Sequence, residues 1–402
     1  EKMEHKNIPE IRFSGFTNEW EQRKLSEIVD IYDGTHQTPK YTDSGVKFVS
    51  VENISNLKTE KYISQQAYDK EYAKKQAKKG DVLMTRIGDI GTARVIETDE
   101  PLAYYVTLAL LKPKIIESNF LSWLISSPEV QRNIWKRTLH IAFPKKINLG
   151  EINQVEVMIS KEDEQQKIGS FFKQLDDTIA LHQRKLDLLK EQKKGFLQKM
   201  FPKNGETVPE LRFSGFTNEW EQRKLGDLSK VIDPHPSHRA PAATEVGIPF
   251  IGIGDVDEVG NINYKTARIV DEKIFEEHHN RYNLAITSIG IGRVASLGKV
   301  IRLRDDIGKY AVSPTMSVIQ FTNNNDLDFL YSNMNTPIFQ KQFKSFSNGS
   351  TRQSVGIQDL RTLMVSLPID IEEQKKIGLL FKQLDDTIAL HQRKLELLKE
   401  QK

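Results

Sequence analysis

The side chains that could do chemistry in this chain are a few histidines and two stretches of basic residues. The 402 residues include nine histidines and no cysteine, which excludes disulfides, thiolate nucleophiles and cysteine-based zinc sites. His235 and His238 form a lone HxxH pair in a proline-rich loop, and His278 and His279 are adjacent on an expected helix. These histidines do not replace the missing cysteine ligands, so we predict no metal site.

Motifs of the common catalytic sites are missing from the sequence. There is no GxxxxGK[ST] phosphate loop and no Asn/Asp-Pro-Pro-aromatic pocket of the kind that amino-methylating enzymes use on a flipped base. The GIG triplets at 252–254 and 290–292 are too short for a nucleotide-binding fingerprint. Acidic residues are plentiful, but no pair has a spacing that favours acid–base catalysis over a solvated surface. We therefore expect a chain without catalytic activity or a cofactor of its own.

Positive charge is concentrated in two short stretches. The net charge of the chain is only +3, which by itself does not indicate a nucleic-acid partner. Residues 130–147 and 338–358 nevertheless contain several Lys or Arg and no acid. A solvated helix and loop would explain either stretch alone, but their recurrence at matching positions favours a shared role. The basic residues are Arg132, Lys136, Arg137, Lys145 and Lys146 in the first stretch, and Lys341, Lys344 and Arg352 in the second.

Two blocks of sequence occur twice and must position these stretches. Residues 11–25 read IRFSGFTNEWEQRKL and residues 211–225 read LRFSGFTNEWEQRKL, identical after the first letter. FKQLDDTIALHQRKLDLLKEQK at 172–193 returns as FKQLDDTIALHQRKLELLKEQK at 381–402 with one difference. Chance cannot produce such matches, so the chain is two tandem units.

The segments between the repeats resemble each other only faintly. FLSWLISSPEVQ from Phe120 matches FLYSNMNTPIFQ from Phe329, and MTRIGDIGTARV at 84–95 echoes ITSIGIGRVASL at 286–297. Each segment mixes short β-like runs with helices and with glycine or proline turns, which predicts an α+β globule. We expect the two segments to share this fold while presenting different side chains, with Trp123 and Trp135 in the core.

The second repeated block carries apolar residues at alternating four- and three-residue steps, the pattern of a coiled-coil seam. Its first copy predicts a helix that ends near Phe201 and Pro202 and is roughly 55 Å long. Two equal seams should pair, and we expect an antiparallel, pseudo-twofold pair because a parallel one would crowd both globules at one end. We interpret the equivalent His182 and His391 as packing or partner-contact residues. The expected seam is Ile168, Phe172, Leu175, Ile179, His182, Leu186 and Leu189, then Ile377, Phe381, Leu384, Ile388, His391, Leu395 and Leu398.

The length and composition of the chain allow two or three domains, each with its own core. No stretch approaches the roughly 18 apolar residues that a membrane span needs. No charged-then-apolar leader precedes the first repeat. We therefore expect a cytoplasmic protein.

With these features assembled, the chain resembles the specificity subunit of a type I restriction-modification system. The resemblance covers essentially the whole chain and rests on the alternation of its repeated blocks with two variable segments. DGTHQTPKY at 33–41 and GSTRQSV at 349–355 also match the style of the family. The first long repeat continues as KKGFLQKMF, so we expect a further C-terminal turn or two beyond Lys402.

The resemblance implies two globular target-recognition domains joined by two long helices in an antiparallel coiled coil. It also implies double-stranded DNA with a bipartite site, an unread spacer set by the helices, two modification subunits that hold S-adenosylmethionine, and restriction subunits. The expected parts are a first recognition domain at 1–160, a spacer helix at 161–203, a second recognition domain at 204–370 and a second spacer helix at 371–402.

Under this resemblance we predict DNA contacts on the polar and basic loops of both variable segments. Arg and Gln can read guanine and adenine edges, whereas Lys, Ser and Thr more often hold phosphate. For each residue alone, a solvated loop stays the alternative. The candidates are Thr35, His36, Gln37, Thr38, Lys40, Arg86, Arg94, His140, Lys145 and Lys146 in the first segment, and Ser237, His238, Arg239, Arg293, Lys344, Ser350, Thr351, Arg352 and Gln353 in the second.

Two functions of other classes stay open on the sequence alone. One is a non-catalytic scaffold that binds partner proteins through its coiled coil, and the other is an enzyme of unrecognised type. Binding to a bipartite duplex would separate DNA recognition from the scaffold. Activity of the chain alone with S-adenosylmethionine would indicate the enzyme.

Overall fold

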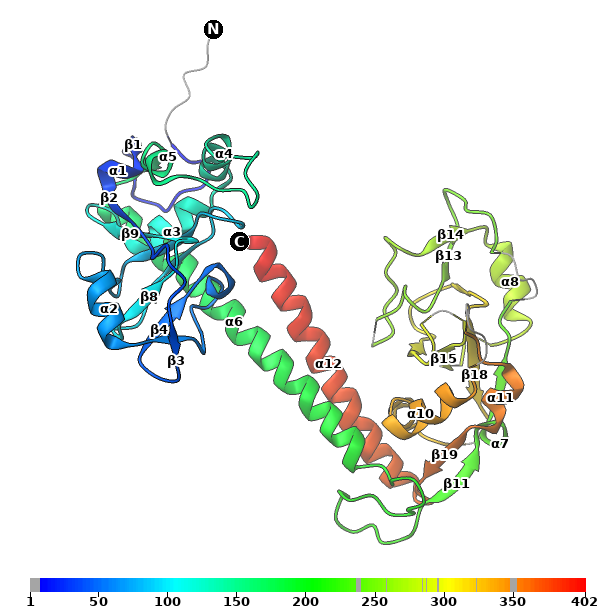
Figure 1. Cartoon of the computed structure of the whole chain (residues 1–402). Coiled ribbons are helices and arrows are strands. Elements are labelled where there is room, and N and C mark those ends of the chain that lie inside the picture. The colour runs from blue at the N-terminus through cyan, green and yellow to red at the C-terminus, as the bar shows by residue number, and fades with distance from the viewer. Residues whose placement is uncertain are drawn as a thin grey trace. The chain divides into compact units, whose positions relative to one another are not determined.

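The chain divides into two compact units, one ending at Thr178 and the other spanning Ile179–Gln401 (Figure 1). Among the described residues, none of the helices combines the length and apolar character that a bilayer span needs. The computed structural model describes residues 8–235, 240–257, 259–283, 285–286, 288–294, 296–322, 324–347 and 353–402.

The first unit is a mixed α+β body. Its strands are β1 Glu21–Lys24, β2 Val29–Asp33, β3 Tyr41–Thr42, β4 Val46–Val49, β5 Tyr62–Ile63, β6 Val82–Thr85, β7 Ala93–Val95, β8 Leu102–Tyr104, β9 Leu108–Pro113 and β10 Glu156–Ile159. Its helices are α1 Leu25–Ile28, η1 Val51–Asn53, α2 Gln65–Tyr72, α3 Ser118–Ser126, α4 Pro128–Lys136, α5 Leu149–Asn153 and the start of α6 Glu162–Lys199. The strands form the sheets β2-β9-β6-β7 and β3-β5-β4-β8 and the ribbon β1-β10.

The central strand β9 explains why the main sheet of the first unit has a core on both faces. Side chains alternate across a strand, and the run LALL places Ala109 and Leu111 in one buried cluster and Leu108 and Leu110 in another. Helices α3 and α4 contribute to the first cluster, and α2 contributes to the second. The continuous apolar run LALL is therefore explained by a strand that is covered on both faces.

The second unit repeats this plan. Its strands are β11 Glu221–Lys224, β12 Ser229–Ile232, β13 Ile248–Ile251, β14 Arg268–Val270, β15 Ser288–Gly292, β16 Val300–Leu303, β17 Ala311–Val312, β18 Met316–Phe321 and β19 Met364–Leu367. Its helices are α7 Leu225–Leu228, α8 Lys273–His279, α9 Leu327–Met334, α10 Pro337–Ser345, α11 Ile357–Thr362 and α12 Ile371–Gln401. The sheet β12-β18-β15-β16 matches β2-β9-β6-β7, and the ribbon β11-β19 matches β1-β10.

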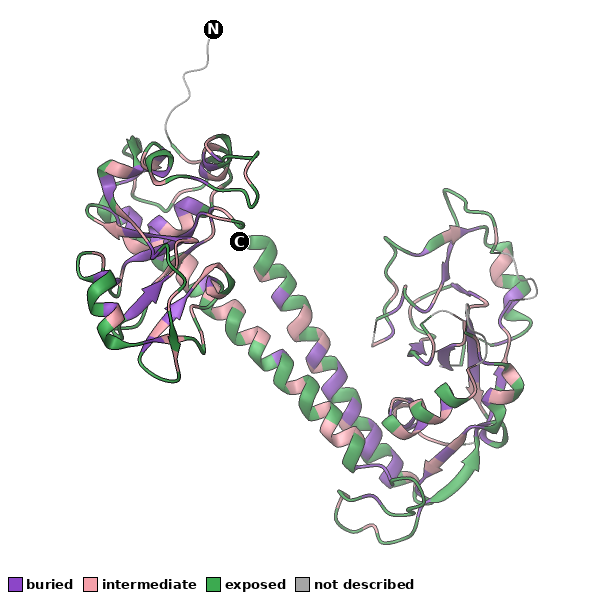
Figure 2. Cartoon of the chain, viewed as in Figure 1, coloured by how far each residue is buried: buried purple, intermediate pink, exposed green. Residues whose placement is uncertain are grey.

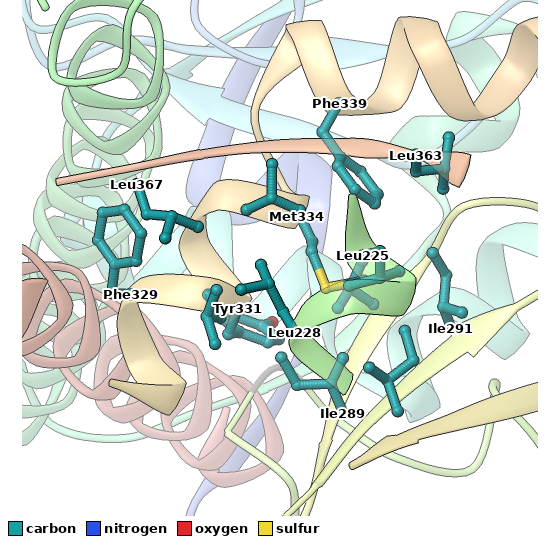
Figure 3. Close-up of a cluster of buried hydrophobic side chains, with 14 of the residues drawn as sticks. Leu225, Leu228, Ile289, Ile291, Phe329, Tyr331, Met334, Phe339, Leu363 and Leu367 are labelled. Atoms are coloured by element: carbon teal, nitrogen blue, oxygen red, sulfur yellow. The ribbon is translucent and has the colours of Figure 1, made fainter. Parts of the chain in front are cut away.

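The largest core of the second unit joins the repeated block to the variable segment. Leu225 and Leu228 of α7 lie against Ile289 and Ile291 of β15, together with residues of α9, α10 and β19 (Figure 3). In both units the strands are largely buried and the surrounding loops are exposed (Figure 2). The predicted α+β fold of both segments is confirmed.

The repeated RFSGFTNEWEQRKL block ties the start of each long helix to its own unit. Arg12 makes a bidentate ion pair with the buried Glu164 of α6, at 2.6 and 2.7 Å. Arg212 binds the buried Glu373 of α12 in the same way, at 2.6 and 2.8 Å. The two EQRK strands also pair in the same register with β10 and β19. The block holds a long helix in each unit, which is a physical reason for its near-identity.

One glycine near the start of each long helix is required by a close approach. A Cβ atom on Gly169 would lie 2.8 Å from the backbone nitrogen of Phe120, and one on Gly378 would lie 2.7 Å from that of Phe329. Those two nitrogens begin α3 and α9, where the capping carboxylates of Glu117 and Asp326 accept their hydrogen bonds. Each long helix therefore packs directly on a capped helix N-terminus.

Within the second unit, α6 from Ile179 onward and α12 run antiparallel (Figure 1). His182 Nδ1 lies 3.0 Å from His391 Nδ1, whereas the later Lys193 reaches back to the earlier Asp385, with 2.5 Å between Nζ and Oδ1. The two histidines are equivalent residues of the repeat, so their contact marks a local twofold relation between the helices. The predicted antiparallel pair is confirmed.

The predicted seam is wrong at the start of the first long helix. Ile168 packs into the core of the first unit, and Phe172 stacks on Trp123 with ring centroids 4.6 Å apart. On α12, Ile377 and Phe381 pack into a cluster that also contains Phe196 and Leu197 of α6. The first turns of α6 have the heptad spacing, but their apolar side chains are covered by the first unit.

Two further predictions need correction. Trp135 is not core, because it is 54% exposed, and Trp123 is only half-buried. Trp135 follows the buried Ile134 on the amphipathic helix α4 and therefore faces away from the core. The second is the sequence match between 84–95 and 286–297. It identifies the equivalent strand and glycine turn, but it aligns their residues in the wrong register. Thr85 corresponds to Gly292, because their strand partners on β9 and β18 are equivalent.

Candidate nucleic-acid interface

A buried arginine ties together three segments of the first unit. Arg86, directly after β6, donates from Nη1 to Asp33 Oδ1 and to the carbonyl oxygen of Val106, both at 2.9 Å. Its Nε donates to the carbonyl oxygen of Ile147 at 3.3 Å. The guanidinium therefore fixes the end of β2, the turn before β9 and the end of the basic stretch. We name this arrangement of Arg86 and Asp33 the arginine clasp.

The second unit contains the same clasp. Arg293 Nη2 lies 3.1 Å from Asp233 Oδ2. The backbone nitrogen of Arg293 donates to Thr315 and that of Arg86 to Thr107, at 3.0 and 2.9 Å. The carbonyl oxygen of each arginine also accepts a hydrogen bond from the end of a basic stretch. The donors are Ile147 at 3.0 Å and Val355 at 2.9 Å.

This equivalence of Ile147 and Val355 aligns the two basic stretches. Residues 139–146, LHIAFPKK, correspond to residues 347–354, SNGSTRQS. We call these segments the first and second reading loops. Lys145 is therefore the counterpart of Gln353.

The clasp brings most of the predicted residues of the first unit together. His36 Nε2 lies 2.6 Å from the other oxygen of Asp33, which joins the loop at 35–40 to the clasp. Gly88 of the adjoining hairpin donates its N–H to the carbonyl oxygen of Lys145 at 2.9 Å. Three segments far apart in sequence therefore meet at Asp33 and Arg86.

The predicted residues of the first unit differ in what they can offer a ligand. The side chains of Gln37, Thr38, Lys40, His140, Lys145 and Lys146 are exposed, as is most of His36. Thr35 and Arg86 are buried, so they position the loops. Arg94 lies on β7 with its Nη1 4.0 Å from Asp176 of α6, and no contact joins it to the clasp within the described residues.

Trp135 adds an aromatic face beside the first reading loop. Lys145 Nζ lies 4.7 Å from the centre of its ring, and the ring of His140 lies 4.2 Å away. His140 Nε2 also donates to the carbonyl oxygen of Trp135 at 2.9 Å. Sequence reasoning missed this group, although an aromatic residue inside an acid-free basic stretch was a signal that could have found it.

In the second unit fewer of the predicted residues can be placed. Arg293 is half-buried in its clasp, and Lys344 and Gln353 are exposed. The loop after β12 also meets Arg281, whose Nη1 donates to the carbonyl oxygen of Asp233 at 3.0 Å. The predicted residues Ser237, His238, Arg239, Ser350, Thr351 and Arg352 lie outside the described residues.

A buried pair of histidines supports the same loop. The rings of His235 and His278 lie 4.6 Å apart, beside Phe250. Burial, followed by the nearby positive charge of His235 and Arg281, lowers the pKa of His278 to about 4. His278 is therefore neutral near pH 7 and packs as an aromatic ring.

Comparisons with known proteins agree with this doubled architecture. The family described as "Type I restriction modification DNA specificity domain" matches residues 17–191 and again 217–400. A "Putative type I restriction enzyme MjaX specificity subunit" of Methanocaldococcus jannaschii is 21% identical to this chain. The alignment covers 98% of this chain and 94% of that relative. The "Type I restriction enzyme MjaVIII specificity subunit" of the same organism is 22% identical over 48% of each chain.

A solved structure supports the fold. The S subunit of a type I restriction-modification system from M. genitalium superposes with a TM-score of 0.68 at 14% identity, covering 97% of this chain and 96% of that one. The two family matches together span most of the sequence, and each contains most of one long helix and one clasp. The chain therefore belongs to the family of type I restriction-modification DNA specificity proteins, which recognise DNA and are not themselves catalytic.

Proposed function

We propose that each recognition domain reads one half of a bipartite DNA target. In the first domain the reading surface is the exposed loop at 36–40 with the first reading loop, and in the second it includes Gln353. The observation that carries this proposal is the repeated clasp. The same Asp–Arg pair holds two loops of unrelated sequence, which is what two half-sites of different sequence require.

The charge and chemistry of the loops support contact with a duplex. Lys145 and Lys146 can neutralise phosphates, and Gln37 and Gln353 can bond adenine bidentately. The buried Arg86 acts on DNA only indirectly, because its guanidinium is engaged by Asp33 and by backbone carbonyls.

We further propose that the two copies of the repeated block dock two modification subunits, and that restriction subunits join this complex. Each copy presents a similar surface, on which a lysine of the long helix lies over a phenylalanine of the block. Lys167 Nζ lies 5.1 Å from the ring centre of Phe16, and Lys376 Nζ lies 4.9 Å from that of Phe216. Two equal surfaces on one chain fit two copies of one partner.

The unread spacer between the half-sites is set, in this proposal, by the helix pair. One heptad could be inserted between His182 and Gln183 and another between Leu390 and His391, where the helices cross their local twofold. Seven residues add roughly 10 Å of helix, which is the rise of about three base pairs. Methylation mapping should then show both half-sites unchanged and a spacer longer by up to that amount.

The direct test measures binding of the chain, assembled with its modification subunits, to a duplex that carries the motif methylated in the host. Scrambling either half-site should lower affinity, whereas changing the spacer sequence at constant length should not. Light scattering should give two modification subunits per chain. A complex that binds all duplexes equally would favour the scaffold function instead.

A further inference from the structure

The tip of the first reading loop carries two apolar side chains that are fully exposed. Ile141 is 99% exposed and Phe143 is 102% exposed. Single exposed apolar residues are common on protein surfaces, but two of them separated by one residue at the tip of a loop are not accounted for by holding phosphate.

The base of this loop is fixed while its tip projects. The N–H of Leu139 donates to the carbonyl oxygen of Lys146 at 2.8 Å, which closes the loop. The next residue, Ile147, donates to Arg86 of the clasp, and Gly88 donates to Lys145. These bonds anchor both ends of a short segment, so Phe143 is held away from the body of the domain instead of collapsing onto it.

The surroundings of the tip favour DNA over a protein partner. His140, Lys145 and Lys146 flank the apolar residues, and the stretch 130–147 contains no acid. A tip that is apolar at its centre and cationic at its rim matches a stack of bases bordered by phosphates. Proteins that bend DNA insert Phe, Ile or similar wedges between base pairs in this way.

We infer that Phe143, supported by Ile141, inserts between two base pairs and kinks the DNA within or beside the first half-site. This inference rests on the proposed DNA-reading function. The aligned residues of the second reading loop are Thr351 and Gly349, neither of which is an apolar wedge. The kink is therefore confined to the half-site of the first domain.

The test uses the full chain assembled with its modification subunits and duplexes carrying the host motif, with 2-aminopurine placed at one position at a time. This base brightens when it loses its stacking neighbour. We expect brightening at one step next to the first half-site and none next to the second. Phe143→Ala should abolish it and weaken binding about 5- to 150-fold, the range measured when a stacking aromatic is removed.

Ile115→Ala is the matched control, because it removes an apolar side chain that is 59% exposed elsewhere in the same unit. It should leave both the brightening and the affinity unchanged. Motif-specific binding without brightening, or Phe143→Ala with wild-type affinity, would overturn the wedge while leaving the proposed function standing. Loss of modification subunits from the Phe143→Ala complex would overturn it in favour of a protein contact. Failure of the wild-type complex to distinguish its motif would remove both proposals.

Discussion

In the first recognition domain, Gln131 of α4 donates to the carbonyl oxygens of Gly91 and Ile125, at 2.8 and 2.7 Å. In the second, Gln340 of α10 donates to Gly298 and Met334, both at 2.8 Å. An equivalent glutamine side chain thus joins the glycine hairpin to the preceding helix in each domain. Together with the arginine clasp, these bonds form a framework that persists although the segments between the repeats differ at most positions.

The contrast lies in what this framework holds. The first reading loop is LHIAFPKK and the second is SNGSTRQS. The first has apolar residues at its tip and two lysines, and the second is polar throughout, with one arginine. The paired clasp arginines Arg86 and Arg293 are buried and half-buried, whereas most of the first reading loop and Gln353 of the second are exposed. Specificity can therefore change without loss of the fold, because the exposed residues carry few of the contacts that stabilise each unit.

The strongest test of this contrast exchanges a whole segment. If residues 26–160 are replaced by the same segment of a relative, one half of the methylated motif should change completely and the other half should stay as it was. The clasp and its loops move together in this exchange, while the repeated blocks stay. Methylation sequencing reads the result, and a change in both half-sites would contradict independent recognition domains.

The shared framework predicts equal costs for equivalent mutations. Arg12→Ala and Arg212→Ala each leave a buried carboxylate, Glu164 or Glu373, without its partner. Breaking an ion pair in this way is strongly destabilising, because it leaves a buried charge uncompensated. Hydrogen exchange resolved by unit should show each mutation loosening its own long helix to a similar degree. A large cost in only one unit would show that the repeated blocks are not mechanically equivalent.

Acid should lower the stability of the second unit more than that of the first. The described histidines of the first unit's loops, His36 and His140, are exposed, whereas His278 of the second unit is buried. The pKa of His278 falls from its ordinary 6.5 to about 4 in the folded protein. Below pH 6.5 the unfolded chain takes up a proton that the folded unit refuses, so the second unit should lose stability as pH falls, by on the order of 3 kcal/mol at pH 4. Above pH 6.5 this effect vanishes.

Urea unfolding between pH 7 and 4, followed by hydrogen exchange in each unit, measures that difference. His278→Gln should flatten the pH dependence of the second unit while leaving that of the first unchanged. An equal loss of stability in both units, or an unaltered profile in the variant, would argue against the buried histidine as its source.

The sequence alone was sufficient for the doubled architecture and for the antiparallel helices. Identical blocks and a heptad pattern are strong local signals, and His182 and His391 do meet. The seam was overextended because a heptad cannot distinguish a helix partner from a domain core. Phe172 satisfies the spacing but packs on Trp123 of its own unit.

The candidate interface was harder to predict because burial is decided by contacts far apart in sequence. Arg86 has the same chemistry as an exposed base-reading arginine, and only its distances to Asp33 and Val106 show that it is buried and engaged. Trp135 is a large aromatic residue of the kind often found in a core, yet its position on the outer face of α4 leaves it exposed. Which residues read bases stays a prediction, and mutation of the aligned loop positions can test it.

The last contrast is a single aligned pair, Lys145 and Gln353. A lysine that neutralises a phosphate contributes to binding of any duplex, so Lys145→Ala should lower affinity for motif and random DNA alike. It should also reduce the slope of log affinity against log salt by about 0.9. A glutamine that bonds adenine contributes only where adenine is present, so Gln353→Ala should cost about 1–3 kcal/mol on the motif and little on random DNA, with an unchanged salt slope. Lys58→Ala, an exposed lysine outside the reading loops, serves as the control for removing one charge. If Gln353→Ala instead weakened all duplexes equally, or Lys145→Ala lost affinity only on the motif, the division of the two loops into phosphate and base contacts would be wrong.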